Sequence, residues 1–243
     1  MLALAFASAF AVAALGGEVS PAYFWMWNSK LDRATLTAQL DDMAAHGLGS
    51  VCVHPFPKEF RPDRMPSDMS PDYLSSAYLD LLGKVFDHGA ALGMNQWFYD
   101  EGGWPSGGAC GQVVKSDPEG RFAPRFLVPD GKGGYEVQVR AYDGPDARYR
   151  PAEFAPYPSV LEKGTTERFI ELTHDRIERA IGRHFGKSVK FAFTDEPDMP
   201  PALGWPADGL GWTADFGELF RMRFGYDLEP FAGELIARRD EMD

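Results

Sequence analysis

The chain has 243 residues, of which 44% are apolar and 25% are charged, so its length suits one large domain or two small ones. This composition is that of an ordinary folded protein, and it excludes a disordered, collagen-like or polytopic membrane protein. The formal net charge of −12 argues against nucleic acid as a partner, because an acidic surface repels phosphate groups. The aromatic content of 14% is compatible either with stacking on sugar rings or with packing in a core.

The chain starts with an apolar run, MLALAFASAFAVAAL, that is too short to span a bilayer and has the length of a signal-peptide core. Ala11 and Ala13 supply a small-residue cleavage pattern, but the first basic residue is Lys30, so the usual charged start is absent. We expect a signal peptide over residues 1–20 and a secreted or periplasmic protein over residues 21–243. The alternative is an N-terminal apolar helix packed on the core. The rest of the chain has no apolar run long enough for a membrane span.

Strand-like segments alternate with helical patterns along the chain. Strands are expected at residues 22–28, 49–54, 94–101 and 189–196, and helical periodicity occurs at residues 31–47, 78–91 and 165–185. This alternation predicts parallel β/α units, arranged either in a barrel or in an open doubly wound sheet. The first strand is apolar throughout, which predicts burial on both of its faces.

An insertion is expected over residues 112–162, after the third strand. It contains two strand-like segments, at residues 121–128 and 135–142, that predict a β-hairpin. A further helix is expected at residues 213–223, with no fifth buried strand after it. An eight-unit barrel typically needs about 250 residues, whereas this chain has nearly that length and contains only about four units. We therefore interpret residues 21–243 as the N-terminal half of a (β/α)8 (TIM-type) barrel.

Polar residues stand at the end of each predicted strand, which is where parallel α/β folds build their sites. These residues are Asn28, His54, Asp100 with Glu101, and Asp195 with Glu196. Side chains alternate across a strand, and the small residues Ala192 and Thr194 are expected to face the crowded barrel axis. Glu196 shares their face, so we expect it at the mouth of the barrel, with Phe191 and Phe193 turned toward the helices.

Two carboxyl groups are the minimum apparatus for hydrolysing a glycosidic bond. Glu196 and Glu101 are the pair to consider, because partial burial among aromatic rings would raise the pKa of a carboxyl group toward the value that suits a general acid. The competing interpretation is that one glutamate binds a sugar hydroxyl without doing chemistry. Asp100 and Asp195 would then cap turns, and His54 would be structural.

The glycine-rich loop GGWPSGG follows the third strand at residues 102–108. Its glycines would let the backbone approach a ligand closely, and Trp104 offers a flat face for a sugar ring. A rigid structural loop is the alternative. The loop is not a phosphate-binding P-loop, because the lysine and hydroxyl residue that follow the last glycine of such loops are absent.

Four motifs together resemble the ordered motifs of glycoside hydrolase family 106, whose characterised members are alpha-L-rhamnosidases. The motifs are FWMWN at residues 24–28, VHP at 53–55, WFYDEGGWPSG at 97–107 and FTDEP at 193–197. The resemblance extends over residues 21–231. Two departures are Phe56, where the family often carries arginine, and the length, since family members are far longer.

The resemblance implies a secreted or periplasmic (β/α)8 domain that removes terminal rhamnose from glycans with inversion, with calcium nearby in some members. The sequence itself requires no cofactor. The expected catalytic residues are Glu196 and Glu101, and the expected sugar contacts are Trp27, Asn28, His54, Asp100, Trp104 and Asp195. One catalytic carboxylate could belong to the missing half of the barrel. The alternatives are a non-catalytic sugar-binding or degenerate half-barrel, and another carbohydrate-active barrel. An open half-barrel edge also predicts self-association.

Overall fold

The computed structural model describes residues 21–139, 156–197 and 209–238. The predicted signal peptide, residues 1–20, lies outside these ranges, as does the end of the predicted second hairpin strand, at residues 140–142. Within the described ranges, no helix combines the length and the apolar character that crossing a membrane requires.

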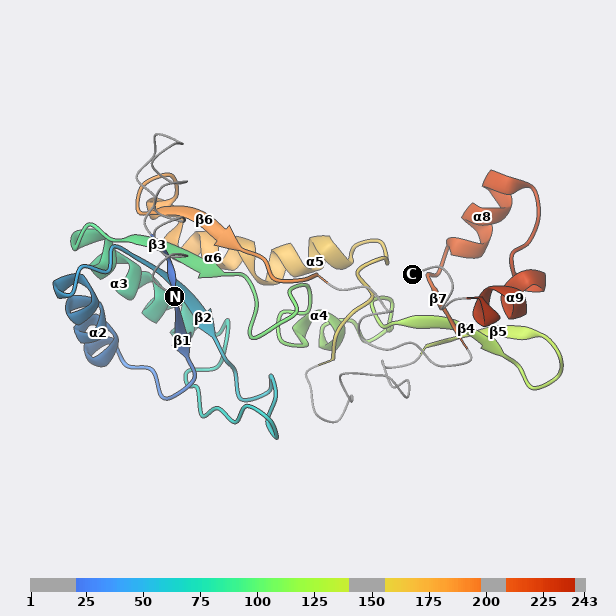
Figure 1. The fold of residues 1–243 in the computed structure, drawn as a ribbon, viewed down its shortest axis with the longest axis horizontal. Coiled ribbons are helices and arrows are strands. Elements are labelled where there is room, and N and C mark those ends of the chain that lie inside the picture. The colour runs from blue at the N-terminus through green and yellow to red at the C-terminus, as the bar shows by residue number, and fades with distance from the viewer. Residues whose placement is uncertain (1–20, 140–155, 198–208, 239–243) are drawn as a thin grey trace, which may run out of the picture.

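Four parallel strands form the main sheet (Figure 1). They are β1 (Tyr23–Trp27), β2 (Ser50–Pro55), β3 (Asn95–Tyr99) and β6 (Val189–Phe193), hydrogen-bonded in the order β1-β2-β3-β6. The fold is therefore mixed α/β with a parallel sheet, as the alternating pattern predicts. The sheet is open in the part of the chain that is described, and its membership of a barrel stays a proposal.

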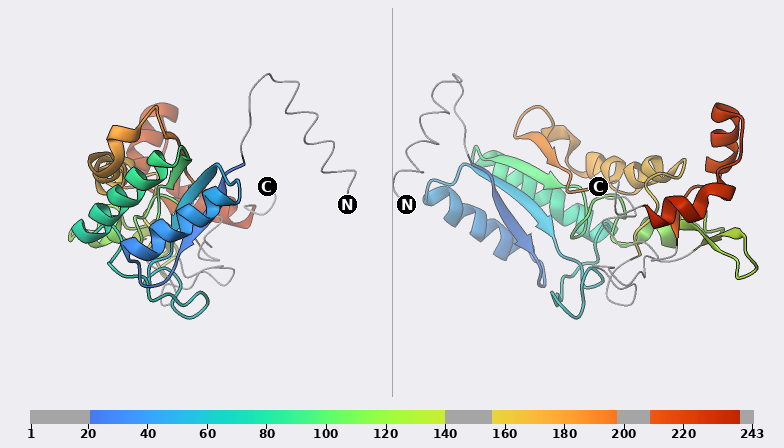
Figure 2. Two further views of the ribbon diagram at one scale, coloured as in Figure 1. Left: turned by 90° about the vertical axis from the view of Figure 1, so that its left-hand side faces the viewer. Right: turned by 45° about the vertical axis from the view of Figure 1, so that its right-hand side comes forward.

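Helices cover one face of this sheet (Figure 2). They are α2 (Arg33–Ala45), α3 (Ser76–Ala91), α5 (Thr165–Leu172), α6 (His174–Ile181) and the 3-10 turn η2 (Gly182–His184). Helices α2 and α3 start where side chains cap them: Asp32 accepts a hydrogen bond from the Thr35 amide, and Ser75 accepts one from the Tyr78 amide. The covered face contains the largest core cluster, in which buried residues of β1 and β2 pack with leucines of α2 and α3.

The described ranges place no helix on the other face of the sheet, which is exposed at its edge strands β1 and β6. Trp25 and Trp27 of β1 are buried toward the helices, whereas Phe24 and Met26 are 49% and 47% exposed. The prediction that this strand is buried on both faces is therefore wrong. An apolar strand with one uncovered face is unusual for a parallel sheet, whose faces are normally both packed.

The orientation of β6 also differs from the prediction. Phe193 stacks on Tyr99 and Phe191 packs on Trp97, so both phenylalanines lie on the uncovered face instead of toward the helices. The cause is a bulge between Gln96 and Trp97: Gln96 pairs with Val189, but Trp97 pairs with Phe191, so one residue of β6 is skipped. One extra residue in a strand reverses the facing of everything after it.

The helical segment predicted at residues 165–185 is interrupted. Helix α5 ends at Leu172 and α6 begins at His174, with Thr173 between them at φ −109° and ψ −78°. The Thr173 hydroxyl donates a 2.7 Å hydrogen bond to the Phe169 carbonyl, a local bond of the kind that bends helices. The break turns the start of α6 toward the end of β3.

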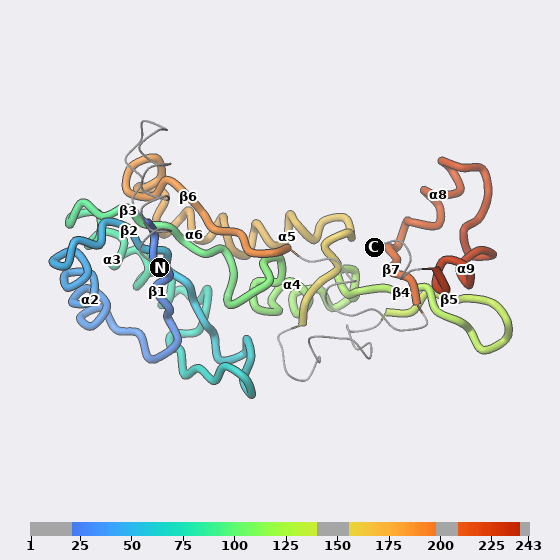
Figure 3. Tube along the Cα trace, viewed as in Figure 1, coloured from blue at the N-terminus to red at the C-terminus, as the bar shows by residue number. Residues whose placement is uncertain are grey.

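A second, antiparallel sheet lies at the opposite end of the molecule from β1 (Figures 1 and 3). It contains the predicted hairpin, β4 (Arg125–Pro129) and β5 (Tyr135–Val139), and a third strand, β7 (Leu210–Trp212), in the order β5-β4-β7. Strand β7 is not predicted by the sequence pattern. The remaining elements are α4 (Gln112–Lys115), α8 (Phe216–Phe224), the 3-10 turn η3 (Glu229–Phe231) and α9 (Ala232–Ala237).

Candidate functional site

The carboxyl ends of the parallel strands bring three side chains together on the uncovered face of the sheet. The His54 imidazole stacks on the Tyr99 ring with 3.6 Å between centroids and 14° between planes. The Tyr99 hydroxyl donates a hydrogen bond to the Asp195 carboxylate. The ring of Phe24 packs beside this group, 5.4 Å from His54. His54 and Asp195 are thus adjacent, although 141 positions separate them in the chain.

His54 combines burial with unused hydrogen-bonding capacity. It is 4% exposed, and neither ring nitrogen has a hydrogen-bond partner of acceptable geometry among the described residues. Burial lowers the pKa of His54 to about 4, and the Gly103 backbone and the Asp195 charge offset only part of this effect. At neutral pH the imidazole is therefore uncharged, with one donor nitrogen and one acceptor nitrogen.

Two hydrogen bonds join the segment after β6 to the loop after β3. The Ser106 amide donates to the Asp195 carbonyl at 2.7 Å, and the Asp195 amide donates to the Ser106 hydroxyl at 2.9 Å. The next residue, Glu196, has φ +42° and an exposed side chain. A left-handed backbone at a residue other than glycine costs about 1–3 kcal/mol, and such strain is concentrated at functional sites.

Glu101 is in a different situation, and the expected catalytic role is not supported for it. It is 2% exposed. Its Oε1 accepts hydrogen bonds from the amides of Gly102 (2.7 Å) and Cys110 (2.5 Å), and its Oε2 accepts from those of Gly108 (2.9 Å) and Ala109 (2.7 Å). Burial raises the pKa of Glu101 to about 7, an effect that these four donors oppose. The carboxylate stabilises the conformation of the loop. Each of its oxygens already accepts two hydrogen bonds, so neither is free for a substrate.

The glycines of this loop approach protein, not a ligand. Gly103 has φ +89°, and a Cβ there would lie 2.2 Å from the Phe60 ring. The Trp104 ring is likewise occupied: the Arg61 guanidinium lies 4.4 Å above it, and Phe60 packs edge-on at 5.0 Å. The structural alternative for the loop is therefore favoured, and the predicted stacking of a sugar on Trp104 would require Arg61 to move.

Trp27 and Asn28 end the first strand, and neither joins the group around His54 through a described contact. Trp27 is 1% exposed and packs on Trp25 and Tyr78 on the helix side, which does not support the prediction that it contacts substrate. Asn28 is exposed at the strand end, and its backbone carbonyl accepts a hydrogen bond from the Ser67 hydroxyl. Asn28 remains accessible to a ligand.

Asp100 lies on the helix side of the sheet and is fully buried. The hydroxyls of Ser106 and Thr194 each donate to its carboxylate at 2.6 Å, and the His174 Nε2 lies 3.5 Å from its Oδ2. Burial raises the pKa of Asp100, and these neighbours oppose the increase. Asp100 therefore ties β3 to β6 and α6 and is not part of the group on the uncovered face.

Sequence reasoning does not identify Tyr99, Ser106, Thr194 or His174 as members of either network. Ser106 and Thr194 stand inside motifs at loop and strand ends, which is a weak signal for them. His174 ends the segment FIELTH at residues 169–174, which adds to the family resemblance, but its position depends on the helix break at Thr173.

The calcium implied by the family resemblance has no built site in the described ranges. No group of three or more histidine, cysteine, aspartate or glutamate side chains there is arranged to hold a metal ion. Both cysteines, Cys52 and Cys110, are buried and free.

Comparisons of the chain with protein-family models, with curated proteins and with solved structures found no match. The resemblance to glycoside hydrolase family 106 therefore rests on the motifs quoted above.

Proposed function

We propose that this chain forms the N-terminal half of a (β/α)8 glycoside hydrolase and that its sugar site lies at the carboxyl ends of β1, β2, β3 and β6. The observation that carries the proposal is the group formed by His54, Tyr99 and Asp195 on the uncovered face, with Glu196 next in the chain. A barrel interior would occupy this side of the sheet, because the helices cover the other. The favoured substrate is a terminal alpha-L-rhamnoside, by the family resemblance.

Within this proposal, Glu196 is the catalytic carboxylate that this chain supplies. Its side chain is exposed at the strand end, whereas the Asp195 carboxylate is engaged by Tyr99 and both oxygens of Glu101 are saturated. Asp195 and His54 would position sugar hydroxyls. The second carboxylate that an inverting mechanism needs would come from outside the described residues.

One observation favours the second candidate function, a sugar-binding protein without hydrolytic activity. With Glu101 committed to four backbone amides, Glu196 carries the single unengaged carboxylate among Asp100, Glu101, Asp195 and Glu196. A sugar could still be held by His54 and Asp195. Hydrolysis distinguishes the two functions.

The test is hydrolysis of 4-nitrophenyl alpha-L-rhamnopyranoside together with calorimetric titration of L-rhamnose. If the proposal is right, Glu196→Gln in a protein that carries both halves of the barrel lowers kcat at least about a hundredfold, which is the typical contribution of one acid or base group. The exposed Glu218→Gln on α8 serves as the matched control and should leave kcat unchanged. In the protein that carries both halves, saturable rhamnose binding without hydrolysis would establish the second function. If the protein neither hydrolyses the rhamnoside nor binds rhamnose, both candidate functions are overturned.

A further inference from the structure

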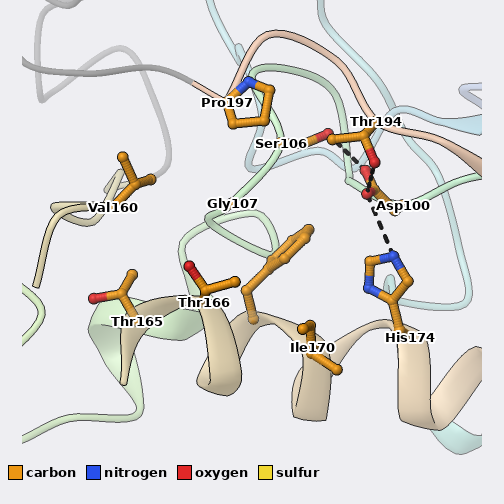
Figure 4. A pocket seen from close by; sticks show the side chains of 11 residues that line it. Asp100, Ser106, Gly107, Val160, Thr165, Thr166, Ile170, His174, Thr194 and Pro197 are labelled. Carbon is orange, nitrogen blue, oxygen red and sulfur yellow. Dashed lines mark hydrogen bonds and ion pairs between the residues drawn. The ribbon is translucent and has the colours of Figure 1, made fainter. Parts of the chain in front are cut away.

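We propose that Asp100, through the hydroxyl groups of Ser106 and Thr194, positions Glu196 by holding the strained turn that carries it. Figure 4 shows both hydroxyl groups directed at the Asp100 carboxylate. Asp100 and Ser106 are then positioning residues, which act on chemistry through Glu196 without touching a substrate. The catalytic part of this inference rests on the proposed function, whereas the conformational part concerns this chain alone.

The backbone of Glu196 has a conformation that its own sequence disfavours twice. Its φ of +42° lies in the left-handed region, which residues other than glycine rarely adopt. It also precedes Pro197, and the proline ring drives the residue before it toward an extended backbone, with φ near about −120°. Such a conformation persists only where the surrounding structure imposes it. The neighbours of Glu196 must therefore hold this turn.

Ser106 holds the peptide group that precedes Glu196. Its amide donates a 2.7 Å hydrogen bond to the Asp195 carbonyl, which belongs to the same peptide plane as the Glu196 nitrogen. The Asp195 amide in turn donates to the Ser106 hydroxyl at 2.9 Å. Because φ of Glu196 is a rotation measured from this peptide plane, Ser106 fixes one of the two groups that define it.

Asp100 fixes the direction of the two hydroxyl groups. The Asp195 amide can only donate, so the Ser106 oxygen accepts from it and gives its own proton to Asp100 Oδ1 at 2.6 Å. The Thr194 hydroxyl donates to Asp100 Oδ2, also at 2.6 Å, and so holds the residue two positions before Glu196. Asp100 and Ser106 are both 0% exposed, so water does not compete for these bonds. Loss of either hydroxyl group should let the turn relax and redirect the Glu196 side chain.

The first measurement is φ of Glu196 in this chain, obtained from the three-bond NMR couplings of its amide. The wild type should give a positive φ, and Ser106→Ala should move φ to the extended region. Ser188→Ala, at the opposite end of β6, is the matched control and should keep φ positive, because the Ser188 hydroxyl has no hydrogen bond within the described ranges. Circular dichroism establishes that both variants are folded. A φ that stays positive in Ser106→Ala, or an extended Glu196 in the wild type, overturns the proposal.

The second measurement is hydrolysis of 4-nitrophenyl alpha-L-rhamnopyranoside by a protein that carries both halves of the barrel. Ser106→Ala and Thr194→Val should each lower kcat about tenfold or more and change KM less than about twofold, because a misdirected group loses contact mainly with the transition state. Thr194→Ser, which keeps the hydroxyl group, and Ser188→Ala should keep the wild-type kcat.

An unchanged kcat in Ser106→Ala and Thr194→Val, or an equal fall in Thr194→Ser, overturns the positioning role and leaves the proposed function intact. An inactive wild type overturns the proposed function instead. In that case φ of Glu196 in Ser106→Ala still decides whether Ser106 holds the turn.

Discussion

At the residue scale, Glu101 illustrates how one buried carboxylate can organise a loop. Its two oxygens accept four backbone amides from residues 102–110, so the loop folds back over the side chain. The sequence pattern shows a glutamate at a strand end, which is equally the mark of a catalytic residue. Only the path of the backbone after Glu101 distinguishes a loop-stabilising glutamate from a catalytic one. That path cannot be predicted from the local periodicity of the sequence.

We predict that Glu101→Gln destabilises the protein by about 3 kcal/mol, because an amide offers one acceptor oxygen and turns its own N–H groups toward backbone donors. Urea unfolding measures the change. The exposed Glu119→Gln is the control and should be nearly neutral. A loss below about 1 kcal/mol for Glu101→Gln would show that the loop does not depend on this carboxylate.

His54 should make stability depend on pH. Its pKa is lowered from 6.5 to about 4 in the folded protein, so between these values the unfolded chain binds a proton that the folded chain does not. This group's contribution is therefore fully present above pH 6.5 and is lost as pH falls toward 4, by roughly 3 kcal/mol in total.

The measurement is the difference in unfolding free energy between the wild type and His54→Phe, which keeps a ring against Tyr99 but cannot titrate. Taking the difference removes the contribution of Glu101, whose raised pKa lowers stability as pH increases through about 7. The wild type should lose stability relative to the variant as pH falls from 6.5 to 4. A flat difference would contradict the burial of a neutral imidazole.

At the scale of elements, the predicted strands and helices were found where a regular period exists. The four parallel strands are confirmed, as is the hairpin of β4 and β5. The prediction fails for β6 because a bulge at Gln96 and Trp97 reverses its facing, and a bulge leaves no trace in the alternation of a single strand. It misses β7 because that strand has three residues and pairs with β4, far earlier in the chain.

The loop after β3 provides a prediction at this scale. Gly103→Ala should destabilise the protein by about 2 kcal/mol or more, because the new Cβ would meet the Phe60 ring in addition to the strain of a positive φ. Gly120→Ala is the matched control: φ is +67° there, but nothing lies within 4 Å of the added Cβ. Thermal unfolding of both variants separates the clash from the strain. Equal losses of stability in the two variants would show that the Phe60 ring moves aside at little energetic cost.

At the scale of the whole molecule, the main sheet is packed on one side. Its uncovered face exposes Phe24, Met26 and Phe191 together, and contiguous apolar surface of this kind usually marks an interface. This face is where a (β/α)8 barrel would place its interior, so the half-barrel hypothesis would explain why these side chains are exposed. The candidate site was only partly predictable, since His54 and Asp195 stand at predicted strand ends but their contact through Tyr99 depends on the reversed facing of β6.

We expect the chain to self-associate through this face. Light scattering should give a mass above that of the monomer, and the double substitution Phe24→Asp with Phe191→Asp should restore the monomer. The matched control, Leu219→Asp with Met222→Asp, removes comparable exposed apolar surface from α8 and should leave the association intact. A monomeric wild type would contradict the expectation.

The central claim is that a sugar binds at the carboxyl ends of the parallel strands. Backbone amide NMR during a titration with L-rhamnose tests it most directly. The account predicts saturable shifts at Asn28, His54, Asp195 and Glu196, with none at Thr165 or Ile170 of α5. Shifts confined to α5 or to the second sheet, or no saturable shift at any residue, would contradict it.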